Sequence, residues 1–208
     1  MKRIFLAGFK SKTRYNVRLS GRKGVEVVEI NDRKDIEVFL DLLEETAERD
    51  GIRNHPQEHY RKLIALRSQT DVDKNTDVKL YLAKHEGDVL AGAIITFAGE
   101  VATYLHGASS NKKRNLMAPF GLHWEIMKQA KELGYKKYDL GGTKLVKSQK
   151  SKVESQEWMP EDGSWQGITR FKLGFCPNCQ PIEFPGGYDI VISKWKYRLY
   201  RLVQWAKG

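Results

Sequence analysis

The stretch "ATYLHGASSNKKRNLMAPFGLHWEIMKQAKELGYKKYDLGGT", residues 102–143, contains the pattern that decides the fold. An apolar strand leads through a basic turn into a helix, and a second strand follows that ends in two glycines. Pro119 suits the first turn of a helix, where its missing N–H costs nothing. Apolar residues recur behind it at helical spacing, at Leu116, Phe120, Trp124, Met127 and Ala130. They predict a helix over 119–133, beginning near residue 118, with one buried side.

The segments on either side of this helix predict a sheet. Three apolar segments precede it, at 78–85, 89–98 and 101–106. The connections "HEGD" and "AGE" between them are short enough for hairpin turns, so the three segments should form an antiparallel meander. A further strand is expected at 136–140, after the helix.

The rest of the chain adds helices around this sheet. The expected elements are a basic helix at 9–22, a strand at 25–30, helices at 32–50 and from Pro56 to about 67, a polar loop to 163, a helix at 164–173, a strand at 181–192 and a basic helix at 194–206. This order is typical of an α+β domain with helices covering one mixed sheet. It resembles the layout of acyltransferases related to the GNAT fold.

Length and composition indicate one soluble domain. The 208 residues suit a single core, and no apolar run is long enough to span a bilayer. The apolar patch at the N-terminus is too short for a secretory signal, so we expect a cytoplasmic protein. We divide the chain into a basic N-terminal helical segment (1–24), a GNAT-like domain (25–193) and a basic C-terminal helix (194–208) that packs on the domain.

The net charge of +10 is concentrated at the two ends. Residues 1–24 contain eight basic and no acidic residues, and residues 194–208 contain five and none. Lys10, Arg14 and Arg18 fall on one helix face, with Tyr15 nearby. This face would suit an RNA phosphate backbone. A solvated surface, or a face that docks on the C-terminal helix, is the open alternative.

The basic turn before Pro119 is a candidate anion site. Lys112, Lys113, Arg114 and Asn115 stand at the start of the helix. A helix N-terminus presents unpaired backbone donors and a partial positive charge, although such a turn can also simply face water. Coenzyme A acyltransferases have a glycine-rich loop at this place. No glycine lies between Gly107 and Gly121, which argues against coenzyme A.

Several stretches resemble the Fem family (FemA, FemB, FemX) of peptidyl aminoacyltransferases. They are residues 104–142, "SKTRYNVRLSGRKGVEV", "TAERDGIRNH" and "GITRFKLGF", and they follow the family order from about Ser11 to Leu202. The resemblance implies transfer of an amino acid from aminoacyl-tRNA to the stem-peptide amino group of a peptidoglycan precursor. The implied partners are aminoacyl-tRNA and lipid II or a UDP-linked muropeptide, with no coenzyme A or other cofactor.

The chain also departs from that family. Fem proteins usually carry two GNAT-like domains, and here the first is almost wholly absent. The helical hairpin arm of some members is absent too, because 141–163 is too short for it. We therefore weigh a separately encoded first domain, a homodimer that rebuilds the cleft, and a smaller acceptor.

The resemblance points to Lys172 as the group that stabilises developing charge or an RNA phosphate near the aminoacyl ester, with Phe171 beside it. By spacing alone, Lys172 would be a surface lysine whose stem packs on apolar neighbours. Asp139, at the end of its strand, could orient or deprotonate the incoming ammonium. It could equally cap the turn through Gly141 and Gly142.

Other candidates lie around the basic turn. Arg114, with Lys113 behind it, matches the family's basic turn and would bind a substrate phosphate through its forked donors. Tyr104 and His106 alternate on the preceding strand and are candidates to line the same cleft, although one of them is expected to pack in the core.

Cys176 and Cys179 are the only cysteines and form a C-x-x-C turn. Two thiolates are half a zinc site, and the histidines show no partnering spacing, so a plain loop is favoured over a metal or a reversible disulfide. Two other functions remain as alternatives to the Fem-like reaction. One is an N-acyltransferase with an acyl-CoA donor, and the other is a non-catalytic module that binds RNA or a cell-wall precursor.

Overall fold

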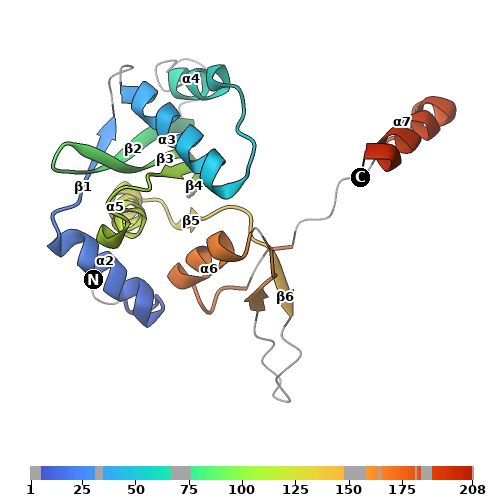
Figure 1. Cartoon of the computed structure of the whole chain (residues 1–208). Coiled ribbons are helices and arrows are strands. Elements are labelled where there is room, and N and C mark those ends of the chain that lie inside the picture. The colour runs from blue at the N-terminus through green and yellow to red at the C-terminus, as the bar shows by residue number, and fades with distance from the viewer. Residues whose placement is uncertain are drawn as a thin grey trace. The chain divides into compact units, whose positions relative to one another are not determined.

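The computed structural model describes residues 6–30, 35–66, 76–147, 158–163, 165–180, 182–183 and 189–207. They fall into two compact units, Met1–Pro177 and Asn178–Gly208. The first unit contains the sheet and most of the helices (Figure 1). The second contains one long helix, α7 (Lys194–Lys207).

A five-stranded mixed sheet forms the centre of the first unit. Its strands, in spatial order, are β1 (Glu26–Ile30), β2 (Thr76–His85), β3 (Asp88–Ala98), β4 (Val101–Ser109) and β5 (Lys137–Asp139). β1 to β4 pair antiparallel, whereas β5 lies parallel to β4. The α+β fold and the meander predicted from the sequence are confirmed.

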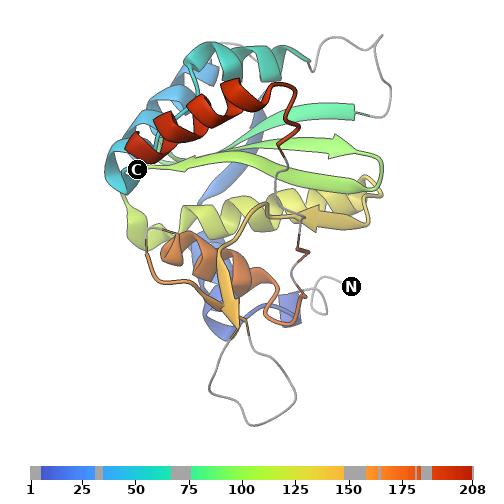
Figure 2. The ribbon, with the colours of Figure 1, turned by 90° about the vertical axis from the view of Figure 1, so that its right-hand side faces the viewer.

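Helices cover both faces of this sheet. α3 (Asp35–Asp50) and α4 (Gln57–Ala65) lie on one face, and α5 (Ala118–Glu132) lies on the other (Figure 2). Side chains of a strand alternate between its faces. Leu80 and Leu82 accordingly pack in the α3 core, and Tyr81 packs in the α5 core.

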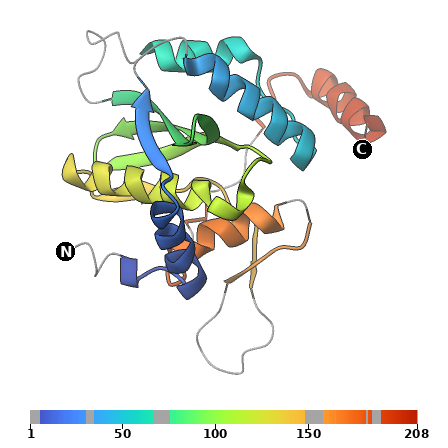
Figure 3. The ribbon, with the colours of Figure 1, turned by 60° about the vertical axis from the view of Figure 1, so that its left-hand side comes forward.

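Two further helices lie beyond α5. α2 (Ser11–Arg22) contacts both α5 and α6 (Gln166–Phe175), as Figure 3 shows. Leu6, Phe9, Val17, Met127 and Phe175 form the apolar cluster between them. This third cluster fixes α6, and therefore the residues that α6 carries, to the rest of the unit.

Two sequence predictions are corrected by the structure. The expected polar loop before residue 163 contains a small antiparallel sheet, β6 (Leu145–Lys147) with β7 (Trp158–Pro160). The strand expected at 181–192 is not formed by its described residues, 182–183 and 189–192, and its other residues lie outside the described ones. The sequence "PGG" at 185–187 interrupts the apolar pattern with residues that disfavour a strand interior.

The helix predicted at 194–206 is present as α7, and its packing on the domain stays a prediction. Within the described part of the chain, no helix combines the length and apolar character needed to cross a membrane.

Close approach of α2 and α5 depends on Gly121. A Cβ at this position would lie 2.3 Å from Ser20 Oγ, which is buried without a hydrogen-bond partner among the described residues. We expect Gly121→Ala to destabilise the protein, because overpacking costs about 1–3 kcal/mol. That cost outweighs the gain of up to about 1 kcal/mol in helix propensity. Urea unfolding measures the difference.

Two controls make this prediction specific. Gly167→Ala in α6 adds a Cβ to open space and should not destabilise. Ser20→Ala combined with Gly121→Ala removes the closest clash and should recover much of the lost stability. Equal stability of Gly121→Ala and the wild type would contradict the packing argument.

Candidate active site

Lys172 lies near the centre of the candidate site. It projects from α6 and is only 8% exposed. Its ammonium donates a hydrogen bond to the Gly142 carbonyl at 2.7 Å and lies 5.7 Å from the centre of the Tyr104 ring. Burial lowers the pKa of Lys172 to about 8, and the negative charge of Asp139 partly opposes this fall. Lys172 is therefore a buried cation and not the surface lysine that its spacing alone suggested.

The turn after β5 brings Asp139 and the two glycines against Lys172. Gly141 donates its N–H to Asp139 Oδ1 at 2.7 Å, so Asp139 does cap this turn. Gly141 has φ +73°, and a Cβ there would lie 3.3 Å from the Tyr104 carbonyl oxygen. A glycine is needed to bring the turn this close to β4. The carboxylate of Asp139 remains on the exposed side of the site.

A buried histidine lies behind Lys172. His123 of α5 is 2% exposed, and its ring meets Tyr104 edge to face with centres 4.5 Å apart. Tyr138 Oη and His123 Nδ1 are 2.8 Å apart. Burial, together with the charge of Lys172, lowers the pKa of His123 to about 3. His123 is therefore neutral at pH 7, and we assign Tyr138 as donor to Nδ1.

The two tyrosines, Tyr104 and Tyr138, are neutral as well, because their hydroxyl groups keep their protons at pH 7. Burial raises the pKa of Tyr104 to about 12 and raises that of Tyr138 well above its ordinary value. Lys172 thus stands among neutral rings, where a positive charge acts more strongly than it does in water. The arrangement can stabilise negative charge that develops on a substrate oxygen.

Phe171 packs beside this group, within the aromatic cluster of α5 and α6. Its ring centre lies 4.8 Å from that of Phe120 and 5.5 Å from that of His123. The structure therefore brings together Lys172, Phe171, Asp139, Gly141, Gly142 and Tyr104 from the sequence prediction. It adds His123 and Tyr138, which sequence reasoning missed because His123 lies on a helix interpreted only by its apolar stripe.

His106 does not line the same cleft as Tyr104, which corrects the sequence expectation. The register of β3 and β4 shifts between Ile94 and Ile95, whose partners are His106 and Tyr104. Leu105 is therefore an extra residue in a β-bulge, which changes the face on which following side chains lie. Tyr104 packs on the α5 side, and His106 meets Tyr60 of α4 with ring centres 5.0 Å apart.

His106 belongs instead to a cluster of three histidines. His59 Nε2 and His106 Nε2 are 3.4 Å apart, and the His55 ring lies 4.5 Å from that of His59. Burial and the two neighbouring histidines lower the pKa of His106 to about 4. The i, i+4 spacing of His55 and His59 was an available signal for this cluster. No group of three or more His, Cys, Asp or Glu residues within the described ranges is arranged to hold a metal ion.

The basic turn is partly neutralised by the β2–β3 hairpin. Lys113 Nζ lies 3.1 Å from both Glu86 and Asp88, and Lys112 Nζ lies 3.7 Å from Asp88. These ion pairs raise the pKa of Lys113. Arg114 and Asn115 are exposed in a short 3₁₀ helix, Arg114–Leu116, that precedes α5. Of the four residues predicted to bind a substrate phosphate, these two are the better placed to meet one.

The three basic residues predicted for RNA also differ from one another. Arg14 donates through Nη1 to the Ala7 carbonyl at 3.2 Å and to the Phe9 carbonyl. Arg14 and Arg18 line a cavity, whereas Lys10 is exposed outside it. The described cavities do not include Lys172, so they mark places other than the candidate active site.

Cys176 and Cys179 are both disulfide-bonded, and the structure contains no free cysteine. The plain loop favoured from the sequence is therefore wrong. A C-x-x-C turn brings two thiols close enough to bond whenever the surroundings are oxidising.

Comparison with known proteins finds one matching family model and several related sequences. The sequence model described as "FemAB family" matches residues 2–67 and 65–205. A "Lipid II:glycine glycyltransferase" of Staphylococcus haemolyticus (strain JCSC1435) is 26% identical over 194 residues, covering 65% of this chain and 46% of the relative. The Staphylococcus aureus protein of the same name is 27% identical over 199 residues, covering 66% and 47%. The chain thus spans less than half the length of these relatives.

Solved structures agree on the fold. "Crystal structure of FemX" superposes with a TM-score of 0.67 and 21% identity, covering 84% of this chain and 56% of that one. An aminoglycoside acetyltransferase, meta-AAC0020 from an uncultured soil metagenomic sample, superposes with a TM-score of 0.50 and 14% identity, covering 80% and 96%. The domain therefore has the GNAT-like α+β fold.

The buried, neutral His123 makes the protein sensitive to acid. The unfolded chain protonates this histidine near pH 6.5, whereas the folded chain does so only near 3. Between these values the unfolded state binds more protons, so stability is lost as the pH falls, by up to about 1.4 kcal/mol per pH unit. We expect His123→Gln to flatten the plot of unfolding free energy against pH between about 4 and 6. Parallel plots for the two proteins would show that His123 is not buried in its neutral form.

Proposed function

The chain belongs to the FemAB family, and we propose that it transfers an amino acid from aminoacyl-tRNA to the stem-peptide amino group of a peptidoglycan precursor, lipid II or a UDP-linked muropeptide. The observation that carries the proposal is the buried ammonium of Lys172, held on the Gly142 carbonyl beside Asp139. The names of the relatives, lipid II:glycine glycyltransferases, support the acceptor class.

The chemistry needs little from the protein beyond positioning and charge. The acceptor amine attacks the carbonyl carbon of the aminoacyl ester, a C–N bond forms, and the C–O bond to the ribose breaks. The ribose oxygen leaves with a proton that originates on the amine. Lys172 would stabilise the negative charge on the carbonyl oxygen during this exchange. Asp139 would orient the incoming ammonium and accept its first proton, so that a neutral amine makes the attack and its second proton goes to the ribose oxygen.

No cofactor takes part in the proposed reaction, because the ester of aminoacyl-tRNA is already activated. Coenzyme A is not favoured, since the turn before α5 lacks the glycines that let a backbone approach a pyrophosphate closely. A cytoplasmic location is part of the proposal, because charged tRNA is made there.

We propose that residues outside this GNAT-like domain contribute to the acceptor side of the site. The chain spans less than half the length of its curated relatives. A partner domain or a second copy of this chain would supply these residues. Assays with lipid II and with a UDP-linked muropeptide test which acceptor is used. Repeating them at several protein concentrations tests whether activity depends on self-association.

Removing the charge of Lys172 should abolish most of the transfer. We expect Lys172→Met, which keeps the side-chain volume, to slow the transfer of radiolabelled amino acids from a charged tRNA pool by about 10²–10³-fold, as measured for other oxyanion donors. Lys137→Ala, which removes an exposed lysine two residues before Asp139, is the matched control and should retain activity. No transfer by the folded wild type with either acceptor, at any concentration, would argue against the reaction. Stabilisation by acetyl-CoA in a thermal shift would then favour the thioester reaction.

The charge on Lys172 also predicts a pH dependence. With a pKa of about 8, Lys172 is mostly protonated at pH 7 and loses its charge as the pH rises through 8. The ratio of the wild-type rate to the Lys172→Met rate should therefore fall between pH 7 and 9. Taking the ratio cancels the titration of the acceptor amine. A constant ratio would assign Lys172 a role that does not depend on its charge.

A further inference from the structure

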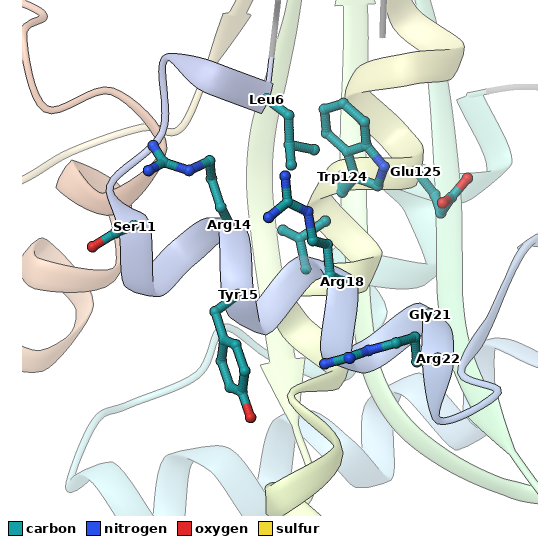
Figure 4. Close-up of a pocket in the computed structure, with 10 residues that line it drawn as sticks. Leu6, Ser11, Arg14, Tyr15, Arg18, Gly21, Arg22, Trp124 and Glu125 are labelled. Carbon is teal, nitrogen blue, oxygen red and sulfur yellow. The ribbon is translucent and has the colours of Figure 1, made fainter. Parts of the chain in front are cut away.

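A cavity of about 730 Å³ lies between α2 and α5 (Figure 4), and Lys172 is not among the residues that line it. Arg14, Arg18 and Arg22 of α2 line it at i, i+4 and i+8, together with Tyr15 and with Trp124 of α5. With a rise of about 1.5 Å per residue, successive arginines stand about 6 Å apart along the helix. The cavity is therefore bordered by a row of cations and not by a single convergent charge.

These arginines are not neutralised by carboxylates. Glu125 is the only acidic residue that lines the cavity, and it pairs with Lys128 at 2.5 Å. Among the described residues, no carboxylate lies within ion-pair distance of Arg18 or Arg22, and residues 1–24 contain no acidic residue at all. Carbonyls of the preceding turn hold Arg14, so part of the row is fixed in place.

Aromatic groups accompany the row of charges. Figure 4 shows Trp124 on the same side of α2 as the Arg18 side chain, where its ring also packs against Phe9. Tyr15 is 56% exposed and points to the opposite side of α2. Arginine forks match phosphate oxygens in a two-pronged geometry, and aromatic faces accept stacked bases. A hollow lined by arginines and aromatic side chains fits a polyanion that carries bases, because the two kinds of side chain can contact its phosphates and its bases.

α2 is also joined directly to the helix that carries Lys172. The Lys10 amide donates to the Gly174 carbonyl of α6 at 2.8 Å. A Cβ at Gly174 would lie 2.3 Å from Thr13 Oγ1, so the two helices touch closely at this place. A ligand bound along α2 would thus be held at a fixed relation to the candidate active site.

We propose that the cavity between α2 and α5 binds the phosphate backbone of the donor tRNA, through Arg18 and Arg22 and with Arg14 as a fixed neighbour. The inference rests on the proposed function, of which it names the RNA-binding site. The three arginines lie in a line along α2, so they match a chain of regularly spaced phosphates better than they match a single pyrophosphate.

The test measures binding of a deacylated tRNA pool by fluorescence anisotropy between 50 and 200 mM salt. We expect Arg18→Ala with Arg22→Ala to weaken binding at least about tenfold and to reduce the slope of log K against log salt by about two. Lys12→Ala with Lys23→Ala removes the same charge from exposed positions outside the cavity and should leave binding near the wild-type value. Equal weakening by the two pairs, or no weakening by the arginine pair, would overturn the proposal.

Two further arms distinguish other ligands. Anionic phospholipid vesicles and a UDP-linked muropeptide should bind the wild type and the arginine pair alike. Loss of either of these ligands in the arginine pair, with tRNA binding intact, would assign the cavity to that ligand and sink the RNA proposal.

Failure of this inference can be separated from failure of the proposed function. RNA binding is measured without any transfer, so tRNA that binds through the arginines in a protein without transferase activity would leave the inference standing alone. In an active protein, the arginine pair should raise KM for aminoacyl-tRNA and leave kcat unchanged. Transfer with unchanged KM would uphold the function and overturn the cavity as its RNA site.

Discussion

The contact between α2, α5 and α6 is the constraint on which both functional regions depend. Two glycines make it possible, since Gly121 admits Ser20 and Gly174 admits Thr13 at distances that a Cβ would not allow. The aromatic and aliphatic cluster of Phe9, Val17 and Phe175 fills the space between the three helices. Because interiors are packed as densely as organic crystals, a shift of one helix must move the others. The cavity on α2 and the lysine on α6 are therefore parts of one rigid arrangement.

Burying the Lys172 ammonium between these helices costs free energy. A fall of its pKa from 10.5 to about 8 corresponds to about 3 kcal/mol by which burial disfavours the ammonium. One hydrogen bond to the Gly142 carbonyl and the nearby charge of Asp139 do not cancel this cost. Ionisable groups whose pKa is strongly shifted by burial are common at functional sites, where the protein uses their charge or proton in chemistry. The neutral state of His123, Tyr104 and Tyr138 leaves the lysine's field unopposed on the core side.

The sequence predicts the fold well, since the meander and the proline-started helix depend on local patterns that the structure keeps. A sequence motif also selects Lys172, Asp139 and the two glycines, which the structure places next to one another, and their roles stay predictions. The β-bulge at Leu105 could not be predicted, since one extra residue changes the face of a strand without changing its composition. For the same reason Tyr104 and His106 looked equivalent.

Ion pairs were the other feature that the sequence concealed, and they change how the net charge is understood. Lys112 and Lys113 meet acidic residues of a hairpin that lies about 25 positions earlier in the chain. Their charges are therefore partly neutralised before any ligand binds. Exposed ion pairs of this kind contribute little stability, but each one neutralises a cation. Arg18 and Arg22 have no such carboxylate partner within the described ranges. The unpaired positive charge of the first unit is therefore concentrated along α2, beside the cavity. A row of like charges that folding leaves unpaired beside a cavity indicates a binding surface more strongly than net charge does, because a polyanion is attracted by the local potential and not by the total charge of the chain.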